Sequence, residues 1–416
     1  MSSRASTQPP PGPLGAGAVP DPAPWRRIAS WAATAMFWDS LLYSALAPVL
    51  PAYADRLSLS DAAAGLLSSA FPAGVLLGAL PAGVAASRLG GRRTVLCGLV
   101  LLAISGVAFG FGQTFSVLVA ARFLEGIASV VVWAGALTWL VACTPAASRA
   151  ATIGRVLGAG VAGTLVGPLA GAGIVATSPQ LVFCVLSGGA LVLAVAMRRL
   201  PAGPPAAASG SVARIARPAY RRRAAGAIWL VTLPAVMVGM LPVLGALRLD
   251  ALGAGAAFIA ATFVVVGTVE AAGTAVGGNA LERVGARRLT VGAYALAAML
   301  MIVALVPQTA WLLACCLVAI VAPIALTWTP AMLRLRDVVS AARIGDGHTY
   351  SLFNLAFAGG QMAGAAGGGV LADIGGQALP WGVLAGGMLV TSAALLGRSR
   401  APERSTTTSE DDHAAT

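Results

Sequence analysis

The fold of this chain is constrained most by a series of long apolar stretches separated by short charged or glycine-rich segments. The stretches occupy residues 28–54, 61–86, 94–112, 115–142, 151–175, 180–198, 225–247, 255–280, 289–307, 310–334, 347–372 and 378–397. A helix of about 20 residues crosses the roughly 30 Å hydrocarbon core of a bilayer, so each stretch is long enough to span a membrane once. The pattern therefore predicts twelve transmembrane segments.

Composition decides what kind of spanning segments these are. Charged residues make up 10% of the chain, whereas a soluble domain carries about 25%. Within lipid, only helices and closed barrels satisfy their own backbone polar groups. A barrel strand needs about ten residues of alternating hydrophobicity, and these stretches are longer and do not alternate. We therefore expect an all-α polytopic membrane protein.

The positions of the basic residues predict how the segments are oriented. All 27 basic residues are arginines, and positively charged loops stay on the cytoplasmic side of a membrane. With the N-terminus in the cytoplasm and twelve alternating spans, 24 of the 27 arginines lie on the cytoplasmic side; the exceptions are Arg56, Arg122 and Arg248. We therefore expect a multi-pass plasma-membrane protein with both termini in the cytoplasm. The net charge of +12 reflects these loops, and we expect no nucleic-acid partner.

Three motifs occur twice, about 195 residues apart. The repeated sets are Ser87–Arg93 with Glu282–Arg288, Pro48–Leu50 with Pro242–Leu244, and Gly163, Gly167 and Gly171 with Gly360, Gly364 and Gly368. Nearly equal offsets indicate that one six-helix unit is used twice, which is a transporter architecture with its site at the midplane between the halves. We therefore expect pseudo-symmetric six-helix bundles at 28–198 and 225–397, a cytoplasmic linker at 199–224, and disordered cytoplasmic tails at 1–27 and 398–416.

The loop after the second segment carries glycines and arginines in a distinctive order. Gly83 and Gly90 favour close helix approach and a tight turn, while Arg88, Arg92 and Arg93 can bind helix C-terminal carbonyls or carboxylates. This loop resembles the signature loop of the major facilitator superfamily, which implies the two-bundle fold of that family.

The second copy of this loop adds an acidic residue that the first copy lacks. Glu282 and Arg283 stand where the first copy has Ser87 and Arg88. In the family, a carboxylate at this position helps to latch the outward-facing state. The resemblance therefore does not extend to that latch in the N-terminal half.

The fifth segment repeats small residues at helical spacing. Gly163, Gly167 and Gly171 would let this helix pack backbone to backbone in lipid, and Pro168 would bend it. The pattern resembles the antiporter signature of the drug:proton branch of the same superfamily. It therefore implies an exporter that exchanges protons for a drug-like compound.

Two further positions carry the resemblance to this branch. Asp39 lies nine residues before Pro48, as in the first helix of twelve-helix drug antiporters and vesicular monoamine transporters. Asn354 stands where the monoamine transporters have an aspartate. The resemblance therefore does not imply an intact monoamine-type proton site.

Four ionisable residues lie inside the predicted spans, where each costs about 2.5–3.5 kcal/mol at a helix centre and usually faces the bundle interior. Asp39, near Tyr43, could bind a proton or a cationic substrate group, or simply accept a structural hydrogen bond. Arg122 and Glu125 are three residues apart and can pair on one helix face. Arg122 also resembles the family's proton-coupling arginine, although a purely structural pair fits equally well. Glu270 has no partner in its own helix.

Tryptophans within the spans have two possible places. Trp133, Trp139, Trp328 and Trp381 could line a substrate path, but anchoring at a membrane interface is the commoner fate of tryptophan.

Taken together, these residues predict a secondary active transporter: proton-coupled efflux of a small apolar or cationic compound by alternating access. A metabolite exporter or uptake carrier of the same fold, or a non-transporting membrane scaffold or sensor, are the alternatives. No metal-ligand cluster or nucleophile–base pair is evident, so we expect no enzyme activity, cofactor or metal. The expected partners are a small-molecule substrate, protons and the lipid bilayer, and we expect a monomer.

Overall fold

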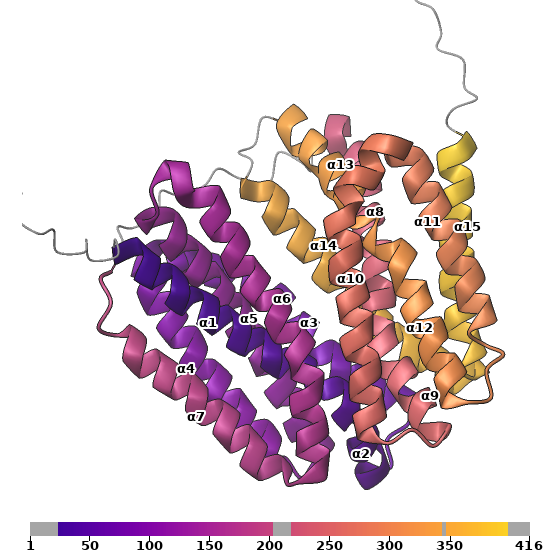
Figure 1. The fold of residues 1–416 in the computed structure, drawn as a ribbon, viewed down its shortest axis with the longest axis horizontal. Coiled ribbons are helices and arrows are strands. Elements are labelled where there is room, and N and C mark those ends of the chain that lie inside the picture. Colours follow the sequence, from indigo (N-terminus) through magenta and orange to yellow (C-terminus); the bar gives the residue numbers. More distant parts are fainter. Residues whose placement is uncertain (1–23, 203–217, 343–346, 398–416) are drawn as a thin grey trace, which may run out of the picture.

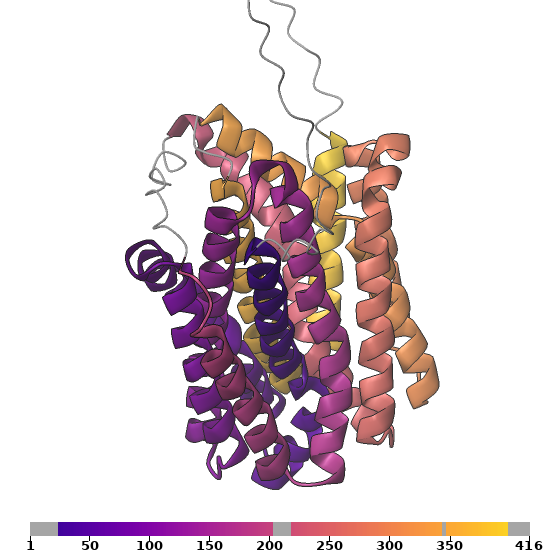
Figure 2. The ribbon, with the colours of Figure 1, turned by 60° about the vertical axis from the view of Figure 1, so that its left-hand side comes forward.

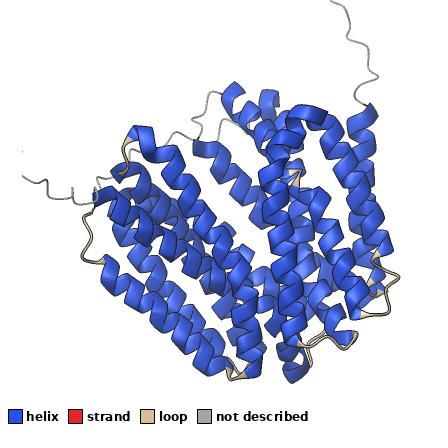
Figure 3. Ribbon diagram, in the orientation of Figure 1, coloured by secondary structure: helices blue, strands red, loops and turns tan. Residues whose placement is uncertain are grey.

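The computed structural model describes residues 24–202, 218–342 and 347–397, which form two helical bundles side by side (Figure 1). The N-terminal bundle contains α1 (Pro24–Ser44), α2 (Leu46–Leu57), α3 (Asp61–Leu89), α4 (Gly91–Gly110), α5 (Phe115–Cys143), α6 (Ala146–Ala176) and α7 (Pro179–Met197). The C-terminal bundle contains α8 (Pro218–Met240), a π-helical turn (Leu241–Gly245), α9 (Ala246–Ala251), α10 (Ala256–Val284), α11 (Ala286–Val303), α12 (Ala310–Ala325), α13 (Trp328–Ala341), α14 (Gly347–Gly375) and α15 (Ala378–Gly397). The described residues are helices joined by short loops (Figure 3). A view turned by 60° shows most helices of both bundles running in roughly the same direction (Figure 2).

The helices match the predicted membrane passes closely. Within the described residues, eleven helical segments are long and apolar enough to cross a membrane, with α1–α2, α8–α9 and α12–α13 each acting as one segment. α14 is not among the eleven, although it has 29 residues, and its sequence is rich in glycine and contains Asn354 and Gln361. α14 packs between α3 and α8. Counted with it, the fold has the expected two sets of six passes.

Two element boundaries differ from the sequence-based expectation. α1 begins at Pro24, within the segment expected to be a disordered tail, and α8 begins at Pro218, within the expected linker. Arginines 221–223 therefore lie in the first turns of a helix. Residues 1–23 and 398–416 of the expected tails, and residues 203–217 of the expected linker, lie outside the described residues.

The repeated glycines pack in equivalent ways in the two bundles. A Cβ added to any of them would strike the facing helix: Gly163, Gly167 and Gly171 of α6 meet Phe37, Leu41 and Ala45 of α1, whereas Gly360, Gly364 and Gly368 of α14 meet Thr232, Val236 and Met240 of α8. The three facing residues are also 195 positions apart in the chain. The two bundles are thus pseudo-symmetric at the level of individual contacts.

Prolines coincide with the places where helices are interrupted. α1 gives way to α2 at Ala45, three residues before Pro48, and the repeat-related Pro242 lies in the π-helical turn. Proline removes a backbone N–H and obstructs the preceding turn, which weakens the helix at that point. A third break follows Pro323, and it places Trp328 at the start of α13.

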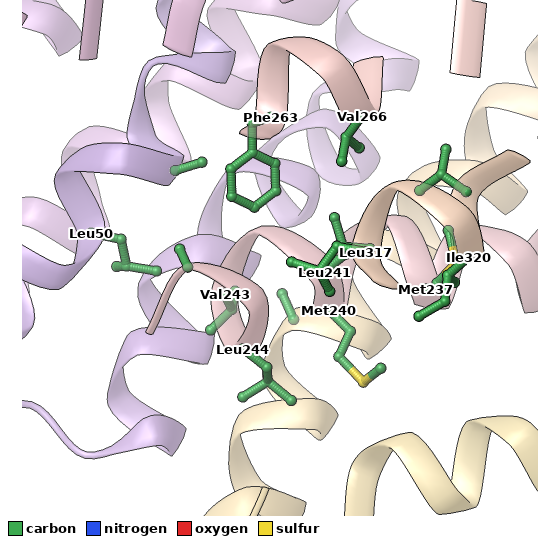
Figure 4. Packing of buried hydrophobic residues seen from close by; sticks show 14 of the residues in the cluster. Leu50, Met237, Met240, Leu241, Val243, Leu244, Phe263, Val266, Leu317 and Ile320 are labelled. Carbon is green, nitrogen blue, oxygen red and sulfur yellow. The ribbon is translucent and has the colours of Figure 1, made fainter. Parts of the chain in front are cut away.

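The bundles are joined by apolar packing at one end. One buried cluster contains residues of both bundles, among them Leu50, Leu67, Val243 and Leu244, whereas two smaller clusters belong to a single bundle each. Figure 4 shows Leu50 of α2 beside Val243 and Leu244 of the π-helical turn. In Figure 1 the helices of the two bundles approach each other at the end that carries α2 and α9, and they diverge toward the end where the chain enters α1 and leaves α15.

The same end holds two of the arginines that depart from the cytoplasmic distribution. Arg56 donates from Nη2 to the carbonyl of Gly112 at 2.9 Å, just beyond the C-terminus of α4. Arg248 donates to the carbonyls of Ala304 and Leu305 at 3.0 and 2.8 Å, just beyond α11. A cation at a helix C-terminus satisfies carbonyls that lack a partner within the helix. These two arginines therefore have a structural role that explains their position.

Candidate functional site

Asp39 lies in α1 and is buried against α5. The residue is only 2% exposed. Oδ2 accepts hydrogen bonds from Ser129 Oγ and Trp133 Nε1, both at 2.8 Å, while Oδ1 has no partner among the described residues. Both donors are neutral. The carboxylate therefore carries an uncompensated charge when ionised, and taking up a proton removes the cost of burying that charge.

Arg122 and Glu125 form the ion pair that their helical spacing allows. Arg122 Nη1 lies 2.8 Å from Glu125 Oε2, and the two side chains are 5% and 7% exposed. The guanidinium carbon also lies 5.1 Å from the ring centre of Phe71 and 5.9 Å from that of Tyr43, which is within the range of a cation–π contact. Glu125 Oε1 is buried and has no hydrogen-bond partner among the described residues. It can therefore receive a proton without first losing another bond.

Tyr43 connects this group to the C-terminal bundle. Its hydroxyl accepts a hydrogen bond from Gln361 Nε2 of α14 at 2.9 Å, and its ring lies 4.5 Å from that of Phe71. Gln361 is buried. Gln361 is not recognisable as a candidate from the sequence, because its partner lies more than 300 residues away in the chain.

Glu270 is the intramembrane acid of the C-terminal bundle and lies in α10. Oε1 accepts a hydrogen bond from Trp328 Nε1 at 3.3 Å, and the side chain stays partly exposed. Trp328 meets Phe353 and Phe357 edge-on, with ring centres 5.9 and 5.4 Å apart. Glu270 also lies within electrostatic reach of Tyr43. Asp39, Arg122 and Glu125 thus lie together in the N-terminal bundle, and Glu270 lies across from them in the C-terminal bundle.

Asn354 is not joined to this network. Its side chain is exposed on α14, and none of the described residues forms a hydrogen bond with it. A role for Asn354 in binding the substrate or a proton therefore stays a prediction.

Two of the tryptophans bond to carboxylates within the spans, and the other two are buried in the protein. Trp133 and Trp328 donate to the two carboxylates, and Trp139 is fully buried, with Nε1 donating to the carbonyl of Pro201 at 3.2 Å. Trp381 is buried as well. A signal for the first two was present in the sequence: Trp133 and Trp328 are separated by 195 residues, the offset of the repeated motifs.

The two signature loops have the same backbone geometry. Gly90 and Gly285 each end one helix and begin the next with φ of +80° and +82°. Arg92 donates to the carbonyls of Arg198 and Leu200, beyond the end of α7. Its counterpart Arg287 donates to those of Leu395 and Leu396 in the last turn of α15 at 2.7 and 2.6 Å.

Other residues of these loops differ from expectation or make no described contact. A Cβ on Gly83 would meet nothing within 4 Å, so the expected close helix approach there is wrong for this conformation. Arg88, Arg93, Glu282 and Arg283 are exposed. In the antiporter-like segment, α6 continues as a helix through the buried Pro168.

The contrast between the two glycines of the first loop can be tested. Gly90→Ala should lower stability, because its backbone lies in a region that costs a residue with a side chain about 1–3 kcal/mol. Gly83→Ala adds a methyl group to open space in a helix and should leave stability unchanged or slightly higher. Thermal unfolding of the two purified variants in detergent measures the difference. Equal melting temperatures would contradict the assigned geometry.

Comparisons with known proteins agree on the family. A sequence model of the Major Facilitator Superfamily matches residues 32–348. The MFS-type transporter ppzB of Metarhizium rileyi is 29% identical over 149 residues, and the alignment covers 35% of this chain and 31% of ppzB. Multidrug resistance protein 2 of Bacillus subtilis is 27% identical over 148 residues, covering 36% of this chain and 37% of that protein. Quinolone resistance protein NorA of Staphylococcus aureus is 29% identical over 121 residues, covering 29% and 31%. The alignments thus span about a third of each relative's length.

Solved structures resemble the fold over almost its whole length. A bacterial homologue of the human lysosomal transporter Spinster, in an inward-facing and occupied conformation, has a TM-score of 0.77 at 16% identity, with 91% of this chain and 98% of that chain covered. The nucleoside transporter NupG has a TM-score of 0.73 at 13% identity, with 90% and 100% covered. At such identities the likeness concerns the fold alone.

Proposed function

Because the chain belongs to the Major Facilitator Superfamily, we propose that it is a secondary active transporter of the plasma membrane. It exchanges protons for a small apolar or cationic compound by alternating access between its two bundles. The observation that carries this proposal is Asp39: a buried carboxylate in the middle of a membrane pass, bonded only to neutral donors. Such residues are costly within a membrane and usually mark a substrate or ion path.

The arrangement of the bundles supports alternating access. Contacts between the bundles include the hydrogen bond from Gln377 Nε2 to Asp61 Oδ2 at 2.7 Å and the close approach of Gly65 to the backbone of Ala365. Both lie toward the end that carries α2 and α9. To expose the central residues at that end, the bundles would have to separate there and close at the opposite end. If the arginine-rich end is cytoplasmic, this conformation faces inward.

Export is favoured over uptake by the relatives. The names of two of them describe resistance to drugs, and the fifth pass carries the small-residue ladder that resembles an antiporter signature. In such an exchange, protons move down their gradient into the cell and the compound moves out. Asp39 and Glu125 are the residues in this site that would carry the proton.

Transport in proteoliposomes tests the proposal. Vesicles with a lumen at pH 6 in a medium at pH 8 should take up the permanent cation ethidium, because protons leaving the lumen drive it inward. With one proton exchanged per cation, each pH unit supports an accumulation of about tenfold. The accumulation should collapse on adding nigericin, which dissipates the pH difference by exchanging protons for potassium, and protein-free vesicles are the control.

Other outcomes point to other functions. Accumulation that persists without a pH difference would contradict proton exchange. If correctly folded protein moves neither ethidium nor a panel of neutral drugs, a narrow exporter or a non-transporting scaffold becomes the better assignment.

A further inference from the structure

Each bundle holds one intramembrane carboxylate through a repeat-related tryptophan. Trp133 donates to Asp39 at 2.8 Å and Trp328 donates to Glu270 at 3.3 Å, and the two tryptophans are 195 residues apart. The acids themselves are not repeat-related, because Asp39 lies in α1 and Glu270 in α10. The repeated tryptophan therefore anchors a different acid in each bundle.

The two acids differ in their exposure to solvent and in the groups that surround them. Asp39 is buried and has Ser129 of α5 as a second donor. The Arg122–Glu125 pair, also on α5, lies nearby. Glu270 is partly exposed, and no cationic side chain bonds with it within the described part of the chain. The carboxylate of Glu270 is therefore more accessible than that of Asp39.

The tryptophan that bonds to Glu270 packs against two further aromatic side chains. Trp328 contacts Phe353 and Phe357 edge-on, and the two phenylalanine rings stack at 6.1 Å. Both phenylalanines are only partly buried. Aromatic faces attract cations and stack on flat ring systems. A carboxylate beside such rings thus offers both a counter-charge and an apolar wall.

We propose that Glu270, Trp328, Phe353 and Phe357 form the binding subsite for the positively charged, aromatic end of the transported compound. This inference rests on the proposed function and names the class of substrate. The cationic group lies at Glu270, whose orientation is fixed by the bond from Trp328, and the ring system packs on the two phenylalanines.

The position of the subsite fits a step in alternating access. Glu270 lies one turn from Gly267, where a Cβ would meet Leu165 of α6, and within electrostatic reach of Tyr43 of α1. A cation bound there lies at the seam between the bundles. Arg122 of the opposite bundle is already paired with Glu125, so the cation has Glu270 as its counter-charge and Asp39 remains available to the proton.

Equilibrium binding to the purified full-length protein tests this subsite. At pH 8, ethidium serves as the aromatic cation and phenanthridine, its neutral parent ring, as the uncharged probe. Glu270→Gln keeps the acceptor for Trp328 but removes the charge, so it should weaken ethidium binding roughly tenfold and leave phenanthridine binding unchanged. Glu270→Asp should retain part of the affinity for ethidium. Phe357→Leu should weaken the binding of both probes.

The controls separate a local effect from a folding defect and from failure of the proposed function. Asp337→Asn removes one exposed charge on α13 and should bind both probes as the unaltered protein does; size-exclusion chromatography reports whether each variant is folded. Unchanged ethidium affinity in folded Glu270→Gln, or an unaltered protein that does not bind ethidium, would overturn the subsite. Ethidium binding that depends on Glu270, without transport driven by a pH difference, would instead support the subsite and contradict proton exchange.

Discussion

Asp39→Asn should abolish transport driven by a pH difference, reducing ethidium accumulation in proteoliposomes to the level of protein-free vesicles. Asparagine keeps the shape of the side chain and can still accept the bonds from Ser129 and Trp133, but it cannot exchange a proton. Without a proton to exchange, the pH difference cannot drive the accumulation, which otherwise reaches about tenfold per pH unit. The loss should therefore lie well outside experimental error.

A second assay keeps this result from being mistaken for misfolding. Exchange of labelled for unlabelled ethidium across the membrane at equal pH requires the substrate site and the conformational change, but no net proton movement. Asp39→Asn should retain this exchange, and Asp337→Asn, which removes an exposed charge far from the centre, should retain both activities. Full proton-driven accumulation by Asp39→Asn would remove Asp39 from the proton path. Loss of both activities would assign it a structural role.

Gly364→Ala should destabilise the C-terminal bundle strongly. The added Cβ would meet the backbone carbonyl of Val236, which cannot move aside as a flexible side chain can. Overpacking of this kind costs about 1–3 kcal/mol, equivalent to a fall in melting temperature of roughly 5 °C. Less protein should also accumulate in the membrane. Thermal unfolding in detergent and quantitative immunoblotting of membranes measure these two effects.

The same helix supplies a control of opposite sign. A Cβ on Gly367 would meet nothing within 4 Å, so Gly367→Ala should preserve or raise stability, because alanine favours a helix over glycine by about 1 kcal/mol. In the N-terminal bundle, Gly163→Ala and Gly158→Ala form an equivalent pair. If both members of a pair behave alike, the ladder does not set the helix separation.

The fold was predictable from the sequence because membrane passes are defined by length and apolarity, which are local properties. The repeated motifs then predicted the two bundles, and the structure confirms this arrangement down to the residues that face each glycine. The positions of helix interruptions were harder to predict from the sequence. The break that places Trp328 against Glu270 follows Pro323, but whether a proline bends, breaks or leaves a helix intact depends on what packs around it, and α6 continues through Pro168.

The candidate site was predictable only in part. Asp39, Arg122, Glu125 and Glu270 stood out because charges are costly in lipid. Ser129, which bonds to Asp39, and Gln361, which bonds to Tyr43, did not stand out, since they are ordinary residues until folding places them beside a charge or a hydroxyl. Gly83 shows the converse: it belongs to a recognisable motif, yet a Cβ added to it would meet nothing within 4 Å.

The repeat also relates the contacts between the bundles, with a consequence for the origin of the molecule. Under the 195-residue offset, α3 corresponds to α10 and α6 to α14, so the α3–α14 contact is the counterpart of the α10–α6 contact. Such an interface is isologous, as in a two-fold symmetric homodimer. A six-helix ancestor could thus have paired with its own copy before gene fusion joined the two. Fusion then freed each half to diverge, and an acid retained on α1 in one half and on α10 in the other is an asymmetry that identical subunits could not have evolved.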